Sequence, residues 1–120
     1  MLYRLGSTYL MGNPYGLREE DIDKVRARDK VCVYCHKQMF KPSKEVWRGD
    51  WATIEHLNHL PPWDNPNTIA ICCSSCNSSR GNKTILNWFN SKFCHDKGIN
   101  PQAVAAPVLA YIREYEGYGD

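Results

Sequence analysis

Four cysteines arranged in two pairs are the residues of this chain whose types and spacing most clearly indicate chemistry. Each pair has the Cys-x-x-Cys spacing, and the pairs are Cys32 with Cys35 and Cys73 with Cys76. Two such pairs supply the four thiolates of a tetrahedral zinc site, and zinc can join segments that are distant in sequence. Because four protein ligands leave no open position on the metal, we expect this zinc to be structural.

A second group of polar residues lies between and directly after the cysteine pairs. Glu55 and His56 are adjacent near the end of a β-rich segment, and Asn77 follows the second pair immediately. An imidazole can take a proton from water near neutral pH, and carboxylate and amide oxygens bind hard divalent cations. This combination indicates metal-assisted hydrolysis of a phosphodiester, with His56 as general base and Glu55 and Asn77 as ligands of an Mg²⁺-like ion. His59 is the rival base.

Structural interpretations of the same residues stay open at this point. His56 could be a buried histidine on a strand face, Glu55 a solvated glutamate, and Asn77 the capping residue of a helix. His36 and Cys72, which adjoin the cysteine pairs, could replace a zinc ligand.

The order of these residues resembles the signature of the HNH endonucleases, the ββα-metal or His-Me finger nucleases. In that pattern an acidic residue precedes His, an Asn opens a second strand, and His or Asn follows a Cys-x-x-Cys. Glu55-His56, Asn67 and Asn77 stand at these places, over a resemblance that spans roughly residues 17 to 115. Glu55 replaces the family's more common Asp, and Asn67 lies one residue early, so Thr68 is the alternative for the middle position.

The resemblance implies an α+β fold with a ββα-metal core, a structural four-cysteine zinc site and flanking helices. It also implies hydrolysis of DNA, most often double-stranded, with Mg²⁺ or Mn²⁺ as the catalytic ion. Arg80 and Lys83 would contact phosphates near the scissile bond. Small nucleases of this kind resemble those of phages and of bacterial restriction or defence systems, so a homodimer or a phage or defence protein is the expected protein partner.

Two other classes of function compete with the nuclease. One is a zinc-ribbon-like module that binds nucleic acid without catalysis. The other is a zinc-dependent nucleobase deaminase, which fits less well because its His-x-Glu and Pro-Cys motifs are missing here.

Composition places these residues in one small domain. The chain has 120 residues and a net charge of +2, which is weak evidence for a nucleic-acid partner. No apolar run has transmembrane length and the first residues lack the apolar core of a signal peptide, so we expect no membrane association and a cytoplasmic location. In a reducing compartment six cysteines are more typical of metal binding than of disulfides, which leaves Cys72 and Cys94 as buried thiols.

The elements expected to position the site run strand, loop, strand, cysteine pair, helix. We expect strands over 51–57 and 68–72, joined by a proline-containing loop, and a helix that ends near Gly81. Before them come an N-terminal arm over 1–16, a helix over 17–30 and a polar loop over 37–50. The domain would therefore cover residues 17–116, with a short tail over 117–120.

Two further helices are expected after the site. One covers 84–92, and the other is capped by Asn100, begins at Pro101, is kinked at Pro107 and ends at Gly117. Tryptophans are expected as core or loop anchors rather than base-stacking platforms, at Trp47, Trp51, Trp63 and Trp88. Basic side chains that could extend a surface for backbone phosphates are Arg26, Arg28, Lys30, Lys37, Lys41, Lys44 and Arg48.

Overall fold

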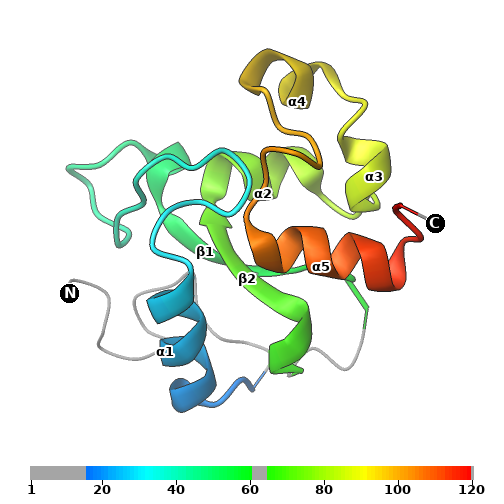
Figure 1. Cartoon of the computed structure of the whole chain (residues 1–120). Coiled ribbons are helices and arrows are strands. Elements are labelled where there is room, and N and C mark those ends of the chain that lie inside the picture. The colour runs from blue at the N-terminus through cyan, green and yellow to red at the C-terminus, as the bar shows by residue number, and fades with distance from the viewer. Residues whose placement is uncertain (1–15, 61–64, 120) are drawn as a thin grey trace.

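A two-stranded antiparallel sheet lies at the centre of the molecule, with helices packed around it (Figure 1). The computed structural model describes residues 16–60 and 65–119, so nearly all of the arm expected over 1–16 and the loop residues 61–64 lie outside it. Helix α1 packs against β2, and α2 packs against both strands. Among the helices in the described part of the chain, none is long and apolar enough to cross a membrane.

The sheet consists of β1 (Ala52–His56) and β2 (Ile69–Cys73). Ala52 lies opposite Cys73, and His56 lies opposite Ile69. Both strands lie within one residue of the segments expected from the sequence. The register therefore puts the second cysteine pair at one end of the sheet and His56 at the other. The loop between the strands ends in a short 3-10 helix, η3 (Pro66–Thr68).

Strand β2 leads without a linker into α2 (Ser74–Arg80). Cys73 is the residue that caps this helix, because its Sγ accepts a hydrogen bond from the backbone N of Cys76 at 3.4 Å. The helix ends where the sequence indicated, at Gly81, whose φ of 56° is a conformation that glycine adopts without strain. The element order strand, loop, strand, cysteine pair, helix is confirmed.

The outer edge of β2 is covered by the end of α1 (Glu19–Arg28) and the segment after it. Asp29 Oδ2 accepts a hydrogen bond from the backbone N of Ile71 at 3.0 Å, and Arg28 Nη2 donates to the carbonyl of Ile69 at 3.1 Å. The backbone N of Val33 donates to the carbonyl of Ile71 at 3.3 Å. These contacts satisfy backbone groups that a two-stranded sheet would otherwise leave unpaired.

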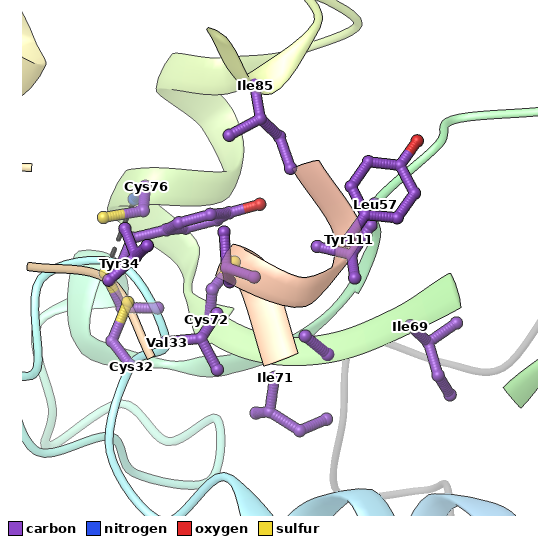
Figure 2. Packing of buried hydrophobic residues seen from close by; sticks show 14 of the residues in the cluster. Cys32, Val33, Tyr34, Leu57, Ile69, Ile71, Cys72, Cys76, Ile85 and Tyr111 are labelled. Atoms are coloured by element: carbon purple, nitrogen blue, oxygen red, sulfur yellow. Dashed lines mark hydrogen bonds between the residues drawn. The ribbon is translucent and has the colours of Figure 1, made fainter. Parts of the chain in front are cut away.

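The hydrophobic core lies between the sheet, the first cysteine pair and the C-terminal helices (Figure 2). Its largest fully buried side chain is Trp88, at the end of α3 (Ile85–Trp88). The Trp88 ring meets Tyr34 edge-to-face with centroids 4.8 Å apart, and its Nε1 donates to Ser79 Oγ at 2.9 Å. The buried indole thus has both an aromatic partner and a hydrogen-bond acceptor, as a buried tryptophan requires.

The helix expected over 84–92 is shorter than predicted, because α3 ends at Trp88, and a further helix, α4 (Lys92–Lys97), follows it. Ser91 separates them, because its Oγ accepts a hydrogen bond from the backbone N of Cys94 at 3.2 Å and so caps a new helix. Gly98 ends α4 in the left-handed region, at φ 69° and ψ 29°.

The last helix begins later than expected. It is α5 (Ala106–Tyr115), with Pro107 in its first turn, and residues 101–104 form turns instead. Asn100 Oδ1 accepts from the backbone N of Gln102 at 2.9 Å, which is a local turn rather than a helix cap. The physical reason is proline: it lacks the N–H that an interior helix position needs but fits the first turn. The polar loop over 37–50 is confirmed and ends in a 3-10 helix, η2 (Arg48–Asp50).

Candidate functional site

The four cysteines of the two pairs form one cluster. Their sulfur atoms all lie within 4.8 Å of one another, and Cys35 Sγ is 3.9 Å from Cys73 Sγ. Four sulfurs at tetrahedral corners about 2.3 Å from a zinc ion would be about 3.8 Å apart. The cluster therefore has the size and the donor set for a metal ion such as zinc, and the predicted ligands Cys32, Cys35, Cys73 and Cys76 are brought together.

Local backbone geometry produces this convergence. The first pair sits in a turn in which the backbone N of His36 donates to the carbonyl of Cys32 at 2.9 Å, with His36 in the left-handed region at φ 66°. The second pair spans the β2–α2 junction. Hydrogen bonds from the thiols of Cys32, Cys73 and Cys76 lower the pKa of Cys35. A bound cation would stabilise the thiolate forms in the same way.

The two neighbours that could have replaced a ligand lie outside the cluster. Cys72 is fully buried beside Thr53, and burial raises the pKa of its thiol well above the ordinary value. His36 hydrogen-bonds through Nε2 to the carbonyl of Ala103. Cys94 is buried as expected.

Asn77 joins α2 to β1. Its Nδ2 donates to Thr53 Oγ1 at 2.9 Å and to the carbonyl of Ile54 at 3.2 Å. The helix cap is Cys73, so the capping interpretation of Asn77 is wrong. The side-chain amide of Asn77 therefore lies at the backbone position directly before Glu55.

Glu55 lies in the interior, with 3% of its surface exposed. Its Oε2 accepts hydrogen bonds from the Tyr34 hydroxyl at 2.6 Å and from Arg80 Nη1 at 3.0 Å. Burial raises the pKa of Glu55, while the charge of Arg80 and the bond from Tyr34 act in the opposite direction. Burial and the Glu55 charge raise the pKa of Tyr34 well above its usual range. The interpretation of Glu55 as a solvated glutamate is therefore wrong.

Arg80 holds the end of β1 against the end of α2. Besides Glu55, its guanidinium donates to the carbonyl of His56 at 3.0 Å, the carbonyl of Leu57 at 2.7 Å and the carbonyl of Lys83 at 2.7 Å. Only 1% of Arg80 is exposed. This placement differs from the expected phosphate contact, because every nitrogen of the guanidinium is used inside the protein. Lys83 is exposed, and its Nζ lies 3.4 Å from the carbonyl of Ser79.

His56 is the last residue of β1 and is 7% exposed. Successive strand residues point to opposite faces, so the imidazole of His56 and the carboxylate of Glu55 leave β1 in different directions. The strand ends here in a turn, in which the backbone N of His59 donates to the carbonyl of His56 at 3.1 Å. His59 adopts a positive φ of 51° in this turn.

Thr68 and Asn67, the two residues considered for the middle position of the expected pattern, differ in their surroundings. Thr68 is buried, its Oγ1 donates to the carbonyl of Asn65 at 3.2 Å, and its own carbonyl accepts from the backbone N of Leu57 at 2.8 Å. This last bond fixes the residue that follows His56. Asn67 is exposed and lines a surface cavity of about 380 Å³ together with Tyr111.

The sequence did not indicate that Tyr34 and Thr53 belong to this group of polar residues. It also did not indicate that the side chain of Arg80 is buried against Glu55. Thr53 could have been found, since it lies two residues before Glu55 and therefore on the same strand face. The contacts of Tyr34 and Arg80 with Glu55 span 21 and 25 residues of sequence, and no local pattern indicates them.

Comparisons of the chain with protein-family models, with curated proteins and with solved structures found no match. The described residues define a small α+β protein with a two-stranded sheet and a four-cysteine cluster that could hold a metal ion such as zinc.

Proposed function

We propose that this protein is a metal-dependent endonuclease of the HNH, or ββα-metal, kind, which hydrolyses DNA phosphodiester bonds. The observation that carries the proposal is the contact of Asn77 with β1. Its amide reaches the carbonyl of Ile54 at 3.2 Å, one residue before Glu55 and two before His56. This contact supports the proposal because it attaches Asn77 to the strand that carries Glu55 and His56.

In this proposal His56 takes the proton from the attacking water. Glu55 and Asn77 hold a divalent ion such as Mg²⁺ or Mn²⁺, which when bound stabilises negative charge on the phosphorus centre and the leaving oxygen. The four-cysteine zinc site has a structural role, because it ties α2 to the first cysteine pair. One such site cuts one strand, so a double-strand cut needs a dimer or two events.

The hydrogen bonding of the two proposed ligands is compatible with this role. Both hydrogen bonds found for the Glu55 carboxylate go to Oε2, and both found for the Asn77 amide are donated by Nδ2. The other polar atom of each side chain is an oxygen, Oε1 in Glu55 and Oδ1 in Asn77. We propose these two oxygens as the ligand atoms.

A second function is a zinc-containing module that binds nucleic acid without catalysis. The buried pair of Glu55 and Arg80 favours it, because a carboxylate already neutralised by an arginine has less charge to offer a cation. In this alternative Glu55 and Arg80 only hold the strand to the helix.

Cleavage of supercoiled plasmid tests the proposal. Zinc-loaded wild-type protein is compared with His56→Ala, with and without added Mg²⁺ or Mn²⁺, and metal analysis confirms that the zinc stays bound. The matched control is His95→Ala, since His95 is exposed on α4. The nuclease proposal expects cleavage that needs the added ion, is lost in His56→Ala and is kept in His95→Ala. Intact plasmid with every ion would favour the binding module.

A further inference from the structure

We propose that the loop over 37–50 binds single-stranded nucleic acid, with Trp47 stacking on an unpaired base. The inference rests on the proposed function for the identity of the partner, and adds to it a binding surface outside the proposed catalytic site. This loop leads into β1 and projects beyond the sheet (Figure 1). It therefore lies at the end of β1 opposite His56.

Trp47 is the first observation. It is 67% exposed, more than any other large hydrophobic residue in the described part of the chain. The sequence indicated a core or loop anchor, and Trp88 is one, but Trp47 leaves most of its ring in water. A single exposed apolar side chain needs no explanation by itself. Trp47 is different, because its neighbours hold the exposed ring in a fixed place.

Two contacts fix the Trp47 ring. Lys37 Nζ lies 4.9 Å from the ring centroid, and the same ammonium is held by Asp50 Oδ1 at 2.8 Å. On the loop backbone, the ring packs so closely on Gly49 that a Cβ added there would lie 2.3 Å from Trp47 Cη2. Only glycine allows this packing. A ring fixed before binding loses less conformational entropy when a partner stacks on it.

The charge of the loop complements a nucleic acid. Its four basic residues are Lys37, Lys41, Lys44 and Arg48, and its two acidic residues are Glu45 and Asp50. This gives the loop a net charge of +2, which equals the net charge of the whole chain with its 15 basic and 13 acidic residues. The rest of the chain is therefore neutral overall. Lys44 and Arg48, on either side of Trp47, are exposed.

An exposed aromatic ring among basic side chains is the arrangement that proteins use for single strands. The bases stack on the aromatic face while the cations follow the phosphates. A duplex keeps its bases stacked on each other, so a surface tryptophan has no base face to bind there. We therefore assign the loop to an unpaired strand or an unpaired segment of the substrate.

Binding of a fluorescent oligothymidylate, measured by anisotropy, tests this inference. All proteins carry His56→Ala so that no substrate is cleaved. Because base–aromatic stacking contributes about 1–3 kcal/mol per base, Trp47→Ala is expected to weaken binding roughly 5- to 150-fold. Trp47→Phe should retain most of the affinity. Tyr115→Ala, which removes another exposed aromatic residue on α5, is the matched control and should bind like the parent.

Two further variants separate ring position from charge. Gly49→Ala keeps Trp47 but displaces its ring, so it should weaken binding as Trp47→Ala does. The double variant Lys44→Gln with Arg48→Gln keeps the Trp47 ring but removes two positive charges. It should reduce the slope of log affinity against log salt concentration by about 1.4, since each phosphate contact on a single strand contributes about 0.7.

The outcomes distinguish this inference from the proposed function. Unchanged binding by Trp47→Ala, an equal loss in Tyr115→Ala, or no binding of the single strand by the parent overturns the inference, even if wild-type protein cleaves plasmid. Trp47-dependent binding by the His56→Ala parent, together with wild-type protein that leaves plasmid intact with every ion, supports the inference and rejects the nuclease.

Discussion

Arg80 Nη1 lies 3.0 Å from Glu55 Oε2, and the two side chains form an ion pair with 2% and 4% of their side-chain surface exposed. A pair this deeply buried depends on both partners, because removal of one leaves a charge in a medium of low polarity. Here the pair also connects the last residues of β1 to the last residue of α2. The positions of the proposed catalytic residues on β1 therefore depend on Arg80, a residue that has no catalytic role in the proposal.

Replacing Arg80 with Ala should destabilise the protein by about 3–5 kcal/mol, since Glu55 would stay buried without its partner and the carbonyls of His56 and Leu57 would lose their donor. Urea unfolding of zinc-loaded protein measures this. Lys83→Ala is the control, because Lys83 is exposed and its loss should cost less than about 0.5 kcal/mol. Equal effects of the two substitutions would mean that the buried pair does not hold the strand to the helix.

The pH dependence of stability should reveal whether burial or the charge of Arg80 has the larger effect on the pKa of Glu55. Burial raises the pKa of Glu55 in the folded state above the ordinary value of 4.5. The folded protein then binds this proton more tightly than the unfolded chain. The contribution of Glu55 to stability is therefore present below pH 4.5 and declines as pH rises through the folded pKa.

The comparison of wild type with Glu55→Gln isolates this contribution, because both proteins share the other titrating groups. The stability difference, wild type minus variant, should fall between pH 4.5 and the folded pKa and then level off. Urea unfolding at a series of pH values measures it. A difference that grows with pH would show that the charge of Arg80 outweighs burial.

Zinc binding should require both cysteine pairs. Cys73→Ser removes a sulfur that lies 3.9 Å from Cys35 Sγ, while its hydroxyl can still cap α2, so bound zinc should fall from one ion per chain to none. Cooperative thermal unfolding should be lost with it, because metal binding and folding are coupled in small domains. Cys94→Ser, outside the cluster, should keep the zinc. Metal analysis of purified variants decides between these expectations.

Asn77→Ala should lower plasmid cleavage at least about 100-fold if its amide oxygen is a ligand of the catalytic ion. The control is Thr53→Val, which removes the acceptor for Asn77 Nδ2 but keeps the proposed ligand. Asn77→Ala loses two hydrogen bonds between α2 and β1 and Thr53→Val loses one of them, so each should lose about 1–2 kcal/mol of stability. Similar losses of activity in the two would assign Asn77 to a purely structural role.

The parts of the structure that follow from local chemistry could be predicted from the sequence. The strands lie within one residue of the expected segments, because prolines and the cysteine pair mark where each β-rich run must end. The four-cysteine cluster is confirmed, because the Cys-x-x-Cys spacing of each pair already brings two sulfur atoms close enough to share one metal ion. The end of α2 at Gly81 follows from a backbone conformation that favours glycine.

The rest depends on contacts between distant residues or on competition between neighbouring signals. Asn100 and Pro101 together suggest a helix start. A helix that began there would have Pro107 in its interior, where proline lacks the N–H that the helix needs, so α5 begins at Ala106 instead. The environment of Glu55 comes from Tyr34 and Arg80, which only the fold brings there. The expected nuclease chemistry at Glu55, His56 and Asn77 stays a prediction.

The occupied edges of the sheet limit how this protein can associate with itself. On β2, Asp29 and Val33 use the outward backbone groups of Ile71, and on β1 Asn77 uses the carbonyl of Ile54. A third strand from another copy would have to displace these partners, so edge-to-edge sheet extension is blocked along both strands. If two copies join to cut both strands of a duplex, they must do so through side-chain surfaces, and their separation is then set by helices and loops.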